Sequence, residues 1–416
     1  TIKLDGNYPV GTGNVALGNT AFDSVTSGIQ NTAIGANSMT ANTSGTNNTA
    51  VGRSSLSANT TGAEITAIGT NALSFNSTGR YNTALGSSAL LSNTTANNNT
   101  AVGYQAGYSN TTGEYSTMVG WSAGYANTTG SIEAFGAGAL DANTTGTFNA
   151  AFGRSALTSN TTGNNNVAIG YASLLLNTTA SNNTAVGYQA GYSNTTGSDG
   201  TYVGTQAGYY VTTGLQNTAV GTASLGRNSA TSTTTGNYNS AFGQYSLTAL
   251  QSGSNNTALG YDALRSNTTA NYNTAVGHQA GYSNTTGAAN TFVGGLSAGL
   301  GVVTGSHNVG LGAETLYRLT SGGSNVSIGY QALQFNTTGS SNVAIGREAL
   351  ENNTTASDNT AVGYQAAYAT TTGAENTAVG KRAFYTNTTG QFNSSLGLAA
   401  LFANTTGSYN TALGNA

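Results

Sequence analysis

Apolar and polar residues follow one another along this chain in a short pattern that returns at a fixed interval. A glycine closes each tetrad of the type Thr-Ala-Val-Gly, and 24 such glycines can be aligned between Gly18 and Gly414. The residue before this glycine is apolar in all 24 repeats. From a glycine at position i, the next one stands at i+17 in 20 of the 23 intervals, and at i+16, i+22 and i+18 in the other three. A period this strict is untypical of disorder and indicates a repeat architecture.

Each repeat contains one short β-favouring segment, a run of small residues and a turn such as Asn110–Gly113, Asn-Thr-Thr-Gly. Two helices with 3.6-residue periodicity do not fit into this length, and the 59 glycines disfavour helices further. The single proline leaves almost every backbone N–H free to pair in a sheet. We therefore predict an all-β fold, a parallel β-solenoid (β-roll) of about 24 coils of about 17 residues each. Coils stacked about 4.8 Å apart would extend over roughly 110 Å.

The predicted domain boundary lies where the repeat begins. Residues 14–416 form the predicted β-solenoid repeat domain, and residues 1–13 depart from the pattern. This first segment contains the only proline and alternates Ile2 and Leu4. It is interpreted as an N-terminal cap, or as a donor strand that completes the open end of another copy. The last repeat ends at Asn-Thr-Ala-Leu-Gly without a capping segment, and open solenoid ends favour polymerisation.

The strand pattern also predicts which side chains face the interior. In Asn-Thr-Ala-Val-Gly, Thr and Val lie on one side of the strand, and Asn and Ala lie on the other. Because the Val position is always apolar, we expect it to face inward with Thr, and we expect Ala to face outward. The facing wall is expected from the leucines four places after the glycine, for example Leu73, Leu90, Leu157 and Leu333. Two buried apolar side chains do not offset the conformational entropy lost by the backbone of a coil. A coil is therefore stable only in a stack.

A longer period is superimposed on the short one. The fifteen residues Asn99–Gly113 return unchanged at Asn183–Gly197, with His278 for Tyr at Asn273–Gly287, and with more changes at Asn359–Gly373. The tetrad glycines of these segments, Gly103, Gly187, Gly277 and Gly363, follow one another at intervals close to five short repeats. This spacing indicates duplication of a block of five repeats.

The asparagine of the Asn-Thr-Thr-Gly turn has two interpretations, which the sequence leaves open. Asn tolerates unusual backbone angles at turns, and stacked Asn side chains can form hydrogen bonds along the axis of a stack. The same residues read Asn-x-Thr, the acceptor sequence for N-glycosylation. The ladder is the favoured interpretation, because the acceptor sequence arises readily in a chain rich in Asn and Thr. The candidates are Asn59, Asn93, Asn110, Asn127, Asn143, Asn160, Asn177, Asn194, Asn267, Asn284, Asn336, Asn353, Asn387 and Asn404.

Three bulky residues interrupt the small residues expected on the outer face. The position before the apolar residue of the tetrad is usually Ala, Ser or Gly, but it is Met118, Tyr202 and Phe292 in three repeats. Each of these repeats follows one of the first three copies of the fifteen-residue segment. We consider them candidates for contacts with another copy of the chain; the alternative is that they are isolated exposed apolar residues, which are common.

The composition offers little for chemistry. The chain has 10 Lys and Arg, 13 Asp and Glu, a net charge of −3 and no cysteine. No basic cluster suits nucleic acid, no apolar run reaches the length of a membrane span, and no signal peptide is visible. His278 and His307 are the only histidines, and Glu348 and Glu351 are interpreted as solvated surface residues. We expect no enzyme and no cofactor or metal, with neither nucleic acid nor a membrane as a partner.

The tetrads "NVALG" (Asn14–Gly18), "NTAIG" (Asn31–Gly35) and "NVAIG" (Asn166–Gly170) resemble the head repeats of YadA-type trimeric autotransporter adhesins. The longer form "NTAVGYQA…NTTG" is similar to repeats of phage tail fibres and bacterial surface fibre proteins. The resemblance covers nearly the whole chain, although the adhesin repeats are shorter than the repeats of this chain. It implies an elongated β-roll exposed outside the cell.

Three functional hypotheses follow. The first is a structural subunit of an extracellular filament or surface fibre, which self-assembles through solenoid ends and small-residue faces. The second is the shaft of a trimeric adhesin or phage tail fibre that mediates attachment. The third, ice binding, rests on the flat threonine arrays that β-solenoids can present. It is the weakest, because adjacent threonines of the turn diverge and the strand threonine is expected inside. The expected partners are copies of the chain, with cell-surface glycans or a host receptor as further candidates, at the cell surface or on a virion.

Overall fold

The computed structural model describes residues 11–226 and 233–415. The chain forms two compact units, Thr1–Tyr202 and Val203–Ala416, and each is described by itself. The described part of both units consists of short strands joined by turns and bends, without a helix. Ile2 and Leu4 lie outside the described residues, so the N-terminal cap or donor strand stays a prediction.

In the first unit, one strand forms at each tetrad. The strands are β1 (Val15–Leu17), β2 (Thr32–Ile34), β3 (Thr49–Val51), β4 (Thr66–Ile68), β5 (Thr83–Leu85), β6 (Thr100–Val102), β7 (Thr117–Val119), β8 (Ile132–Phe135), β9 (Asn149–Phe152), β10 (Val167–Ile169) and β11 (Thr184–Val186). The boundary between the two units falls within β12 (Thr201–Val203).

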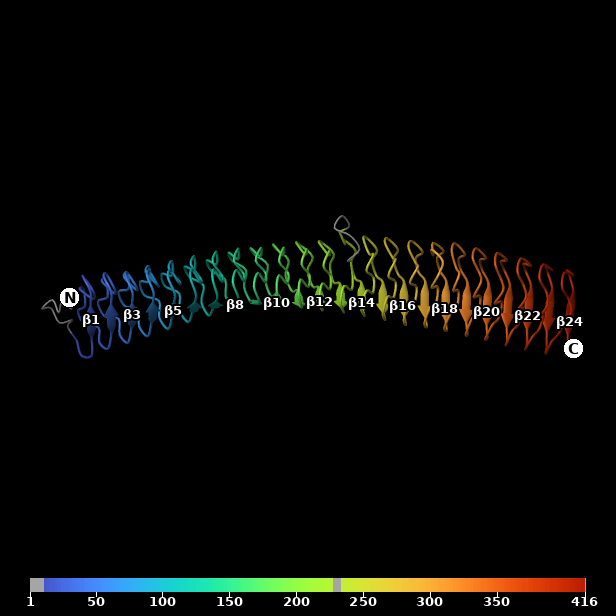
Figure 1. Ribbon diagram of the computed structural model, residues 1–416, viewed down its shortest axis with the longest axis horizontal. Helices are drawn as coiled ribbons and strands as arrows, with labels where there is room; N and C mark the ends of the chain where they lie inside the picture. The colour runs from blue at the N-terminus through green and yellow to red at the C-terminus, as the bar shows by residue number, and fades with distance from the viewer. Residues whose placement is uncertain (1–10, 227–232, 416) are drawn as a thin grey trace. The chain divides into compact units, whose positions relative to one another are not determined.

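The second unit repeats this arrangement. Its strands are β13 (Thr218–Val220), β14 (Ser240–Phe242), β15 (Thr257–Leu259), β16 (Thr274–Val276), β17 (Thr291–Val293), β18 (Val309–Leu311), β19 (Val326–Ile328), β20 (Val343–Ile345), β21 (Thr360–Val362), β22 (Thr377–Val379), β23 (Ser394–Leu396) and β24 (Thr411–Leu413). Figure 1 shows the strands of each unit following one another in chain order.

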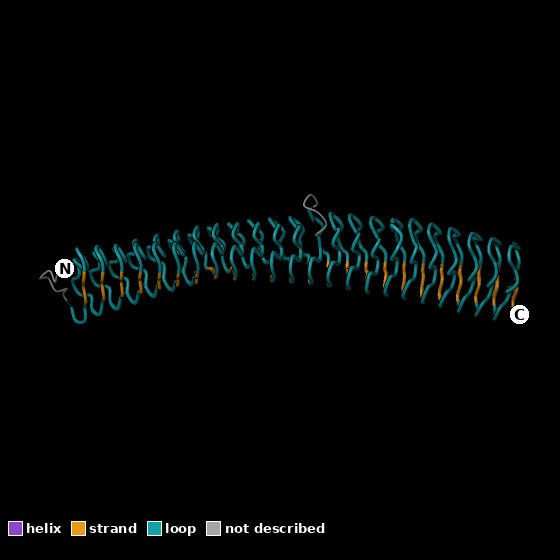
Figure 2. Tube along the Cα trace, in the orientation of Figure 1, coloured by secondary structure: helices purple, strands orange, loops and turns teal. Residues whose placement is uncertain are grey.

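Consecutive strands within each unit pair in parallel and in register. Thr32, Ala33 and Ile34 of β2 lie opposite Thr49, Ala50 and Val51 of β3, and the pairs of the second unit follow the same rule. Each repeat is therefore one coil, with its strand on one side and turns elsewhere (Figure 2). The turns are also bonded between coils, as when the N–H of Met39 donates to the carbonyl oxygen of Ser55 at 3.0 Å. The predicted all-β parallel solenoid is confirmed.

The predicted orientation of the strands is wrong. The alanines at the centre of the strands face inward, and Ala33, Ala50 and Ala67 are 0% exposed. The aliphatic residue before the glycine faces outward, where Ile34 is 36% and Leu85 is 44% exposed. The physical reason is the width of the coil, because the strand and the facing turn lie too close together for two large side chains. A methyl group opposite a leucine fills this space.

The leucine wall is confirmed. Leu73, Leu90, Leu157 and Leu333 are fully buried. Their backbones lie in the left-handed region, with φ of 50° at Leu73 and 48° at Leu90. This region is unfavourable for a residue other than glycine. Packing in the stack stabilises it here.

The three bulky residues are a second correction. Met118, Tyr202 and Phe292 are fully buried and point into the coil. Each side chain occupies space that a glycine leaves where the preceding coil would have its leucine. A Cβ atom built on Gly107 would lie 2.7 Å from Cε of Met118, and one on Gly281 would lie 2.9 Å from Cδ2 of Phe292. Gly191 has the same relation to Tyr202. These residues fill the core and offer no outward contact to another copy.

The tetrad glycine is required by its backbone and by its neighbours. Gly69 has φ of 134°, and a Cβ on it would lie 2.5 Å from the carbonyl oxygen of Gly86 in the next coil. A side chain would therefore meet both strain and a backbone clash. Because every coil lies equally close to the next, the position is glycine in all repeats.

Candidate functional site

The asparagines of the Asn-Thr-Thr-Gly turns form a ladder inside the coils. The side-chain amide of Asn59 donates from Nδ2 to Oδ1 of Asn42 at 2.7 Å and to the carbonyl oxygen of Gly62 at 3.0 Å. Nδ2 of Asn76 then donates to Oδ1 of Asn59 at 2.9 Å. Thirteen of the fourteen candidate asparagines are fully buried, and Asn404 is half-buried. Twelve of them thereby join consecutive coils through their side chains, whereas Asn387 and Asn404 bond within their own turns.

The same geometry opposes N-glycosylation of the folded coils. A glycan replaces one proton of Nδ2, and in Asn93 this atom donates to Asn76 and to the carbonyl oxygen of Ala96. A sugar on the thirteen buried asparagines would have to displace the neighbouring coil. The ladder is therefore the role that the folded structure gives them.

A second asparagine ladder was not predicted. The Asn that stands before the Thr of most strands was placed on the outer face together with Ala, and this assignment is wrong. Oδ1 of Asn31 accepts the backbone N–H of Asn48 at 3.0 Å, and Nδ2 of Asn48 donates to the carbonyl oxygen of Gly62 at 2.9 Å. Both asparagines are buried. The sequence signal was the recurrence of Asn beside the inward Ala, since the same alternation that buries one buries the other.

The first ladder ends where a repeat lacks its asparagine. In the second unit, Thr370 stands at the position that Asn353 has in the preceding coil. Oδ1 of Asn353 and Oγ1 of Thr370 are both buried without a hydrogen-bond partner. A buried polar atom without a partner is destabilising. Nothing in the surrounding residues points to a ligand there.

The outward side of the strands forms a uniform surface along each unit. We define the outer sheet face as the last residue of every strand and the residue two places before it, an aliphatic residue and Thr in most coils. In the first unit, Ile68 and Leu85 are more than one-third exposed, and Leu259 and Ile345 are so in the second. Parallel pairing repeats these residues at about 4.8 Å. Glu133 interrupts the threonines in β8, and burial raises the pKa of its carboxyl group.

Aromatic residues at equivalent positions stack on the surface beside the strands. The rings of Tyr171 and Tyr188 have centroids 5.5 Å apart, and those of Tyr108 and Tyr125 are 5.0 Å apart. His278 stacks on Tyr261 at 5.4 Å, which agrees with a surface substitution of tyrosine at this position. The ring ladders follow from the repeat, because each coil places the same side chain above its neighbour.

The two glutamates of one coil differ from the prediction of a solvated surface. Glu348 is only 8% exposed. Its carboxylate accepts hydrogen bonds from Nε of Arg347 at 2.7 Å and from Nε2 of Gln365 at 2.6 Å. Glu351 is half-buried, and this burial and the charge of Glu348 raise the pKa of its carboxyl group. Glu348 is thereby fixed in a network between coils, which is a structural role.

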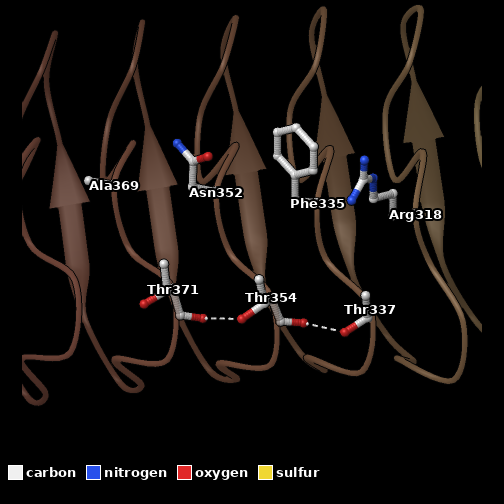
Figure 3. Close-up of a pocket in the computed structure, with 7 residues that line it drawn as sticks. All are labelled: Arg318, Phe335, Thr337, Asn352, Thr354, Ala369 and Thr371. Atoms are coloured by element: carbon white, nitrogen blue, oxygen red, sulfur yellow. Dashed lines mark hydrogen bonds between the residues drawn. The ribbon is translucent and has the colours of Figure 1, made fainter.

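A hollow of about 390 Å³ lies on the second unit, and Figure 3 shows its lining. One row of side chains comes from the same turn position of four consecutive coils, Arg318, Phe335, Asn352 and Ala369. A second row, Thr337, Thr354 and Thr371, runs beside it. None of these residues belongs to a strand. The hollow is therefore separate from the outer sheet face.

The described residues offer no further chemical centre. Within the described ranges, no three His, Cys, Asp or Glu residues come together in a group that could hold a metal ion. Residues 11–226 and 233–415 likewise contain no helix with the length and apolar character to cross a membrane.

No protein-family model matches the chain, and no curated protein sequence matches it. The class of protein is therefore defined by the fold alone, a tandem-repeat parallel β-solenoid with a small-residue and asparagine core.

Proposed function

We propose that the chain is a structural component of an extracellular or cell-surface fibre, in which copies associate side by side through the outer sheet face. The observation that supports this is the continuous row of exposed aliphatic residues. In each unit every strand ends on an aliphatic or aromatic residue that faces outward. Contiguous apolar surface of this kind is rare on monomeric proteins and is typical of interaction surfaces.

The regular spacing favours a copy of the same chain as the partner. A surface that repeats at about 4.8 Å is matched along its length only by another surface with the same repeat. A second copy presents that repeat coil for coil, with threonine beside threonine and aliphatic side chains interlocking. The low charge of the strands adds no repulsion, because the outer sheet face carries Thr and aliphatic residues at most positions. The small-residue face of the first hypothesis is buried and is replaced by this one.

The number of chains distinguishes the two fibre hypotheses. A filament subunit would associate in open-ended assemblies, whereas the shaft of a trimeric adhesin or tail fibre would close with three copies around one axis. Electron microscopy with mass measurement in solution separates threads of variable length from particles of three chains.

The proposal is tested with two variants of one unit. Ile68→Lys with Leu85→Glu places opposite charges on adjacent strands of the outer sheet face. The two charges do not repel each other within one chain, but burying them against a second copy is unfavourable. Phe75→Glu is the matched control, because Phe75 follows Ile68 in the same repeat, is 56% exposed and lies in a turn outside the strands. We expect the wild type and the control to form the same oligomer and the double variant to be monomeric with unchanged circular dichroism. A monomeric wild type at micromolar concentration would contradict the proposal.

Ice binding is the second candidate, and one observation now favours it. The strand threonine was expected inside, but Thr32, Thr49 and Thr66 lie on the outer sheet face in register. Each unit thus presents a row of threonines beside a row of aliphatic residues. Ice needs this face free, whereas fibre association covers it. Thermal hysteresis by the monomeric protein supports ice binding, and its absence at millimolar concentration removes this candidate.

A further inference from the structure

The hollow of the second unit combines three kinds of group along one short path. Arg318 lies at one end, Phe335 follows in the next coil, and the threonine row forms the second wall (Figure 3). Ala369 has no atom beyond Cβ at the other end, which leaves space between the rows. The volume of about 390 Å³ is within the range of about 300–1,000 Å³ typical of small-molecule sites.

Arg318 is a cation without a counter-ion in the described part of the chain. The ion pairs found there join Arg265 to Asp262 and Arg347 to Glu348. The guanidinium carbon of Arg318 lies 4.9 Å from the ring centroid of Phe335, and the side chain is otherwise exposed. Stacking on the ring holds the planar donor fork at the edge of the hollow. A guanidinium in this position suits a carboxylate, which it binds through two parallel hydrogen bonds.

The threonine row can only accept further hydrogen bonds. Oγ1 of Thr337 donates its proton to the carbonyl oxygen of Thr354 at 2.9 Å, and Oγ1 of Thr354 donates to that of Thr371 at 3.1 Å. Figure 3 shows these two bonds running along the row. Each hydroxyl oxygen keeps lone pairs for a donor from outside. A ligand in the hollow must therefore bring O–H or N–H groups to this wall.

We propose that the hollow binds a carboxylate-bearing sugar residue of an acidic glycan. Its carboxylate pairs with Arg318, its C–H face lies against Phe335, and its hydroxyl groups donate to the threonine oxygens. Among common biological ligands, acidic sugars combine a carboxylate, an apolar C–H surface and several hydroxyl donors within one ring. The lining residues include no carboxylate, so the site is one of binding and contains no acid–base pair for glycoside hydrolysis.

The first unit contains a natural control. Phe75 occupies the position of Phe335 in its own coil, and Ser77, Thr94 and Thr111 form the equivalent hydroxyl row. Ala58 and Ser92 stand where the second unit has Arg318 and Asn352. The first unit thus offers the ring and the acceptors without the cation. Ala58→Arg with Ser92→Asn restores the cation and the amide there, with Ser77 and Ser109 in the places of Thr337 and Ala369.

The test is calorimetric titration of the full chain with a hyaluronan tetrasaccharide, which carries glucuronic acid, and with neutral chitotetraose. We expect saturable binding of the acidic probe at one site per chain, weakened by salt, and no comparable binding of the neutral probe. Arg318→Gln should weaken binding about tenfold or more, as expected for the loss of a charge-assisted pair, whereas Arg80→Gln should have no effect. The Ala58→Arg, Ser92→Asn variant should bind a second equivalent.

Three outcomes would overturn the assignment. They are an acidic probe that does not saturate at millimolar concentration, equal affinity for both probes, and an affinity that Arg318→Gln leaves unchanged. The inference does not depend on fibre formation, because the same titration on the monomeric Ile68→Lys, Leu85→Glu variant reports on the hollow alone.

Discussion

At the scale of the residue, the inner turn of each coil selects side chains by backbone conformation as much as by size. The position four places after the tetrad glycine is Leu, Phe, Met, Ala or Gly, and no Val, Ile or Thr stands there in any repeat. Its φ is positive throughout, for example 47° at Met39 and 49° at Leu333. A side chain branched at Cβ crowds the backbone in this region. The wall is therefore built of leucine where a β-branched residue would fill the same volume.

Leu333→Ile tests this selection. The substitution keeps the volume of the side chain but should lower the free energy of unfolding by about 1–3 kcal/mol because of backbone strain. Leu319→Ile is the control, since Leu319 is equally buried and does not have a positive φ. It should cost less than about 1.5 kcal/mol, as for other volume-conserving changes. Urea denaturation followed by circular dichroism measures both, and equal costs would contradict the role of the backbone.

At the scale of the coil, the strand and the turn fill one core space, so that a large side chain in one goes with a small residue in the other. In most coils the strand has Ala and the turn has Leu, whereas the strands with Met118 and Phe292 are preceded by turns with Gly107 and Gly281. The exchange explains why glycine in "YQAGY" and a bulky residue in the next tetrad occur together in three blocks. In the fourth block the turn has Ala367 and the next strand has Ala378. In the first three blocks the core volume is therefore kept, but a strand side chain fills it in place of a turn side chain.

A double-mutant cycle on Gly107 and Met118 measures this exchange. Met118→Ala opens a cavity and should cost about 2–4 kcal/mol, and Gly107→Leu alone forces a clash with the Met118 side chain. The double variant rebuilds the usual Ala and Leu pair and should recover at least about 1 kcal/mol relative to the sum of the single changes. Leucine is compatible with the backbone there, because Gly107 has φ of 62° and Leu90 has 48°. Additive costs in chemical denaturation would show that the two sites do not share one space.

The coils could be predicted from the sequence, but the buried face of each strand could not, and the reason is physical. The period, the tetrad glycines and the leucine wall depend on recurrence, and a single chain displays recurrence 24 times over. Alternation assigns residues to two faces but not to inside and outside, and here the more apolar face is the exposed one. The interior is filled by Ala and by hydrogen-bonded Asn such as Asn31 and Asn59. Coil width, which decides between them, follows from the backbone of the turn, and the order of apolar and polar residues does not give that width.

The hollow could be predicted from the sequence even less well than the buried face of the strands. The hollow depends on residues from several coils, and Arg318, Phe335 and Ala369 each come from a different repeat. A pattern search within one repeat does not bring them together. Alignment of the repeats would have shown that this turn position carries a cation beside an aromatic ring here. It would not have shown that the threonine hydroxyls are already engaged as donors.

At the scale of the whole molecule, each coil depends on its immediate neighbours and hardly at all on distant ones. Variation in coil length is accepted where the strands stay in register. The coil that ends at Gly136 is one position shorter than most, yet Thr117 and Val119 of β7 still lie opposite Glu133 and Phe135 of β8. The missing position comes from the segment after Gly130. The free energy of unfolding is therefore expected to be close to the sum of one contribution from each coil and one from each interface between neighbouring coils.

Deletion of one whole coil tests this sum. Removing residues 149–165 from the first unit takes out one complete repeat and brings Ala168 opposite Ala134, Leu174 beside Leu140 and Asn177 beside Asn143. Asn166, Ala168, Leu174 and Asn177 take the places of identical residues, so both asparagine ladders, the alanine row and the leucine wall are kept, and Ser173 and Ala180 replace Ala156 and Gly163 at two other inward positions. Removing residues 149–157 takes out only part of a repeat and brings turn positions opposite strand positions, which exposes the core of the flanking coils.

We expect the first variant to unfold cooperatively, with the wild-type circular dichroism per residue and a melting temperature within a few degrees, because only one interface between neighbouring coils is lost. The second variant should lose strand signal and be cut rapidly by protease within the first unit. If the longer deletion is as damaging as the shorter one, the coils are not interchangeable units, and stability depends on contacts beyond the neighbouring coil.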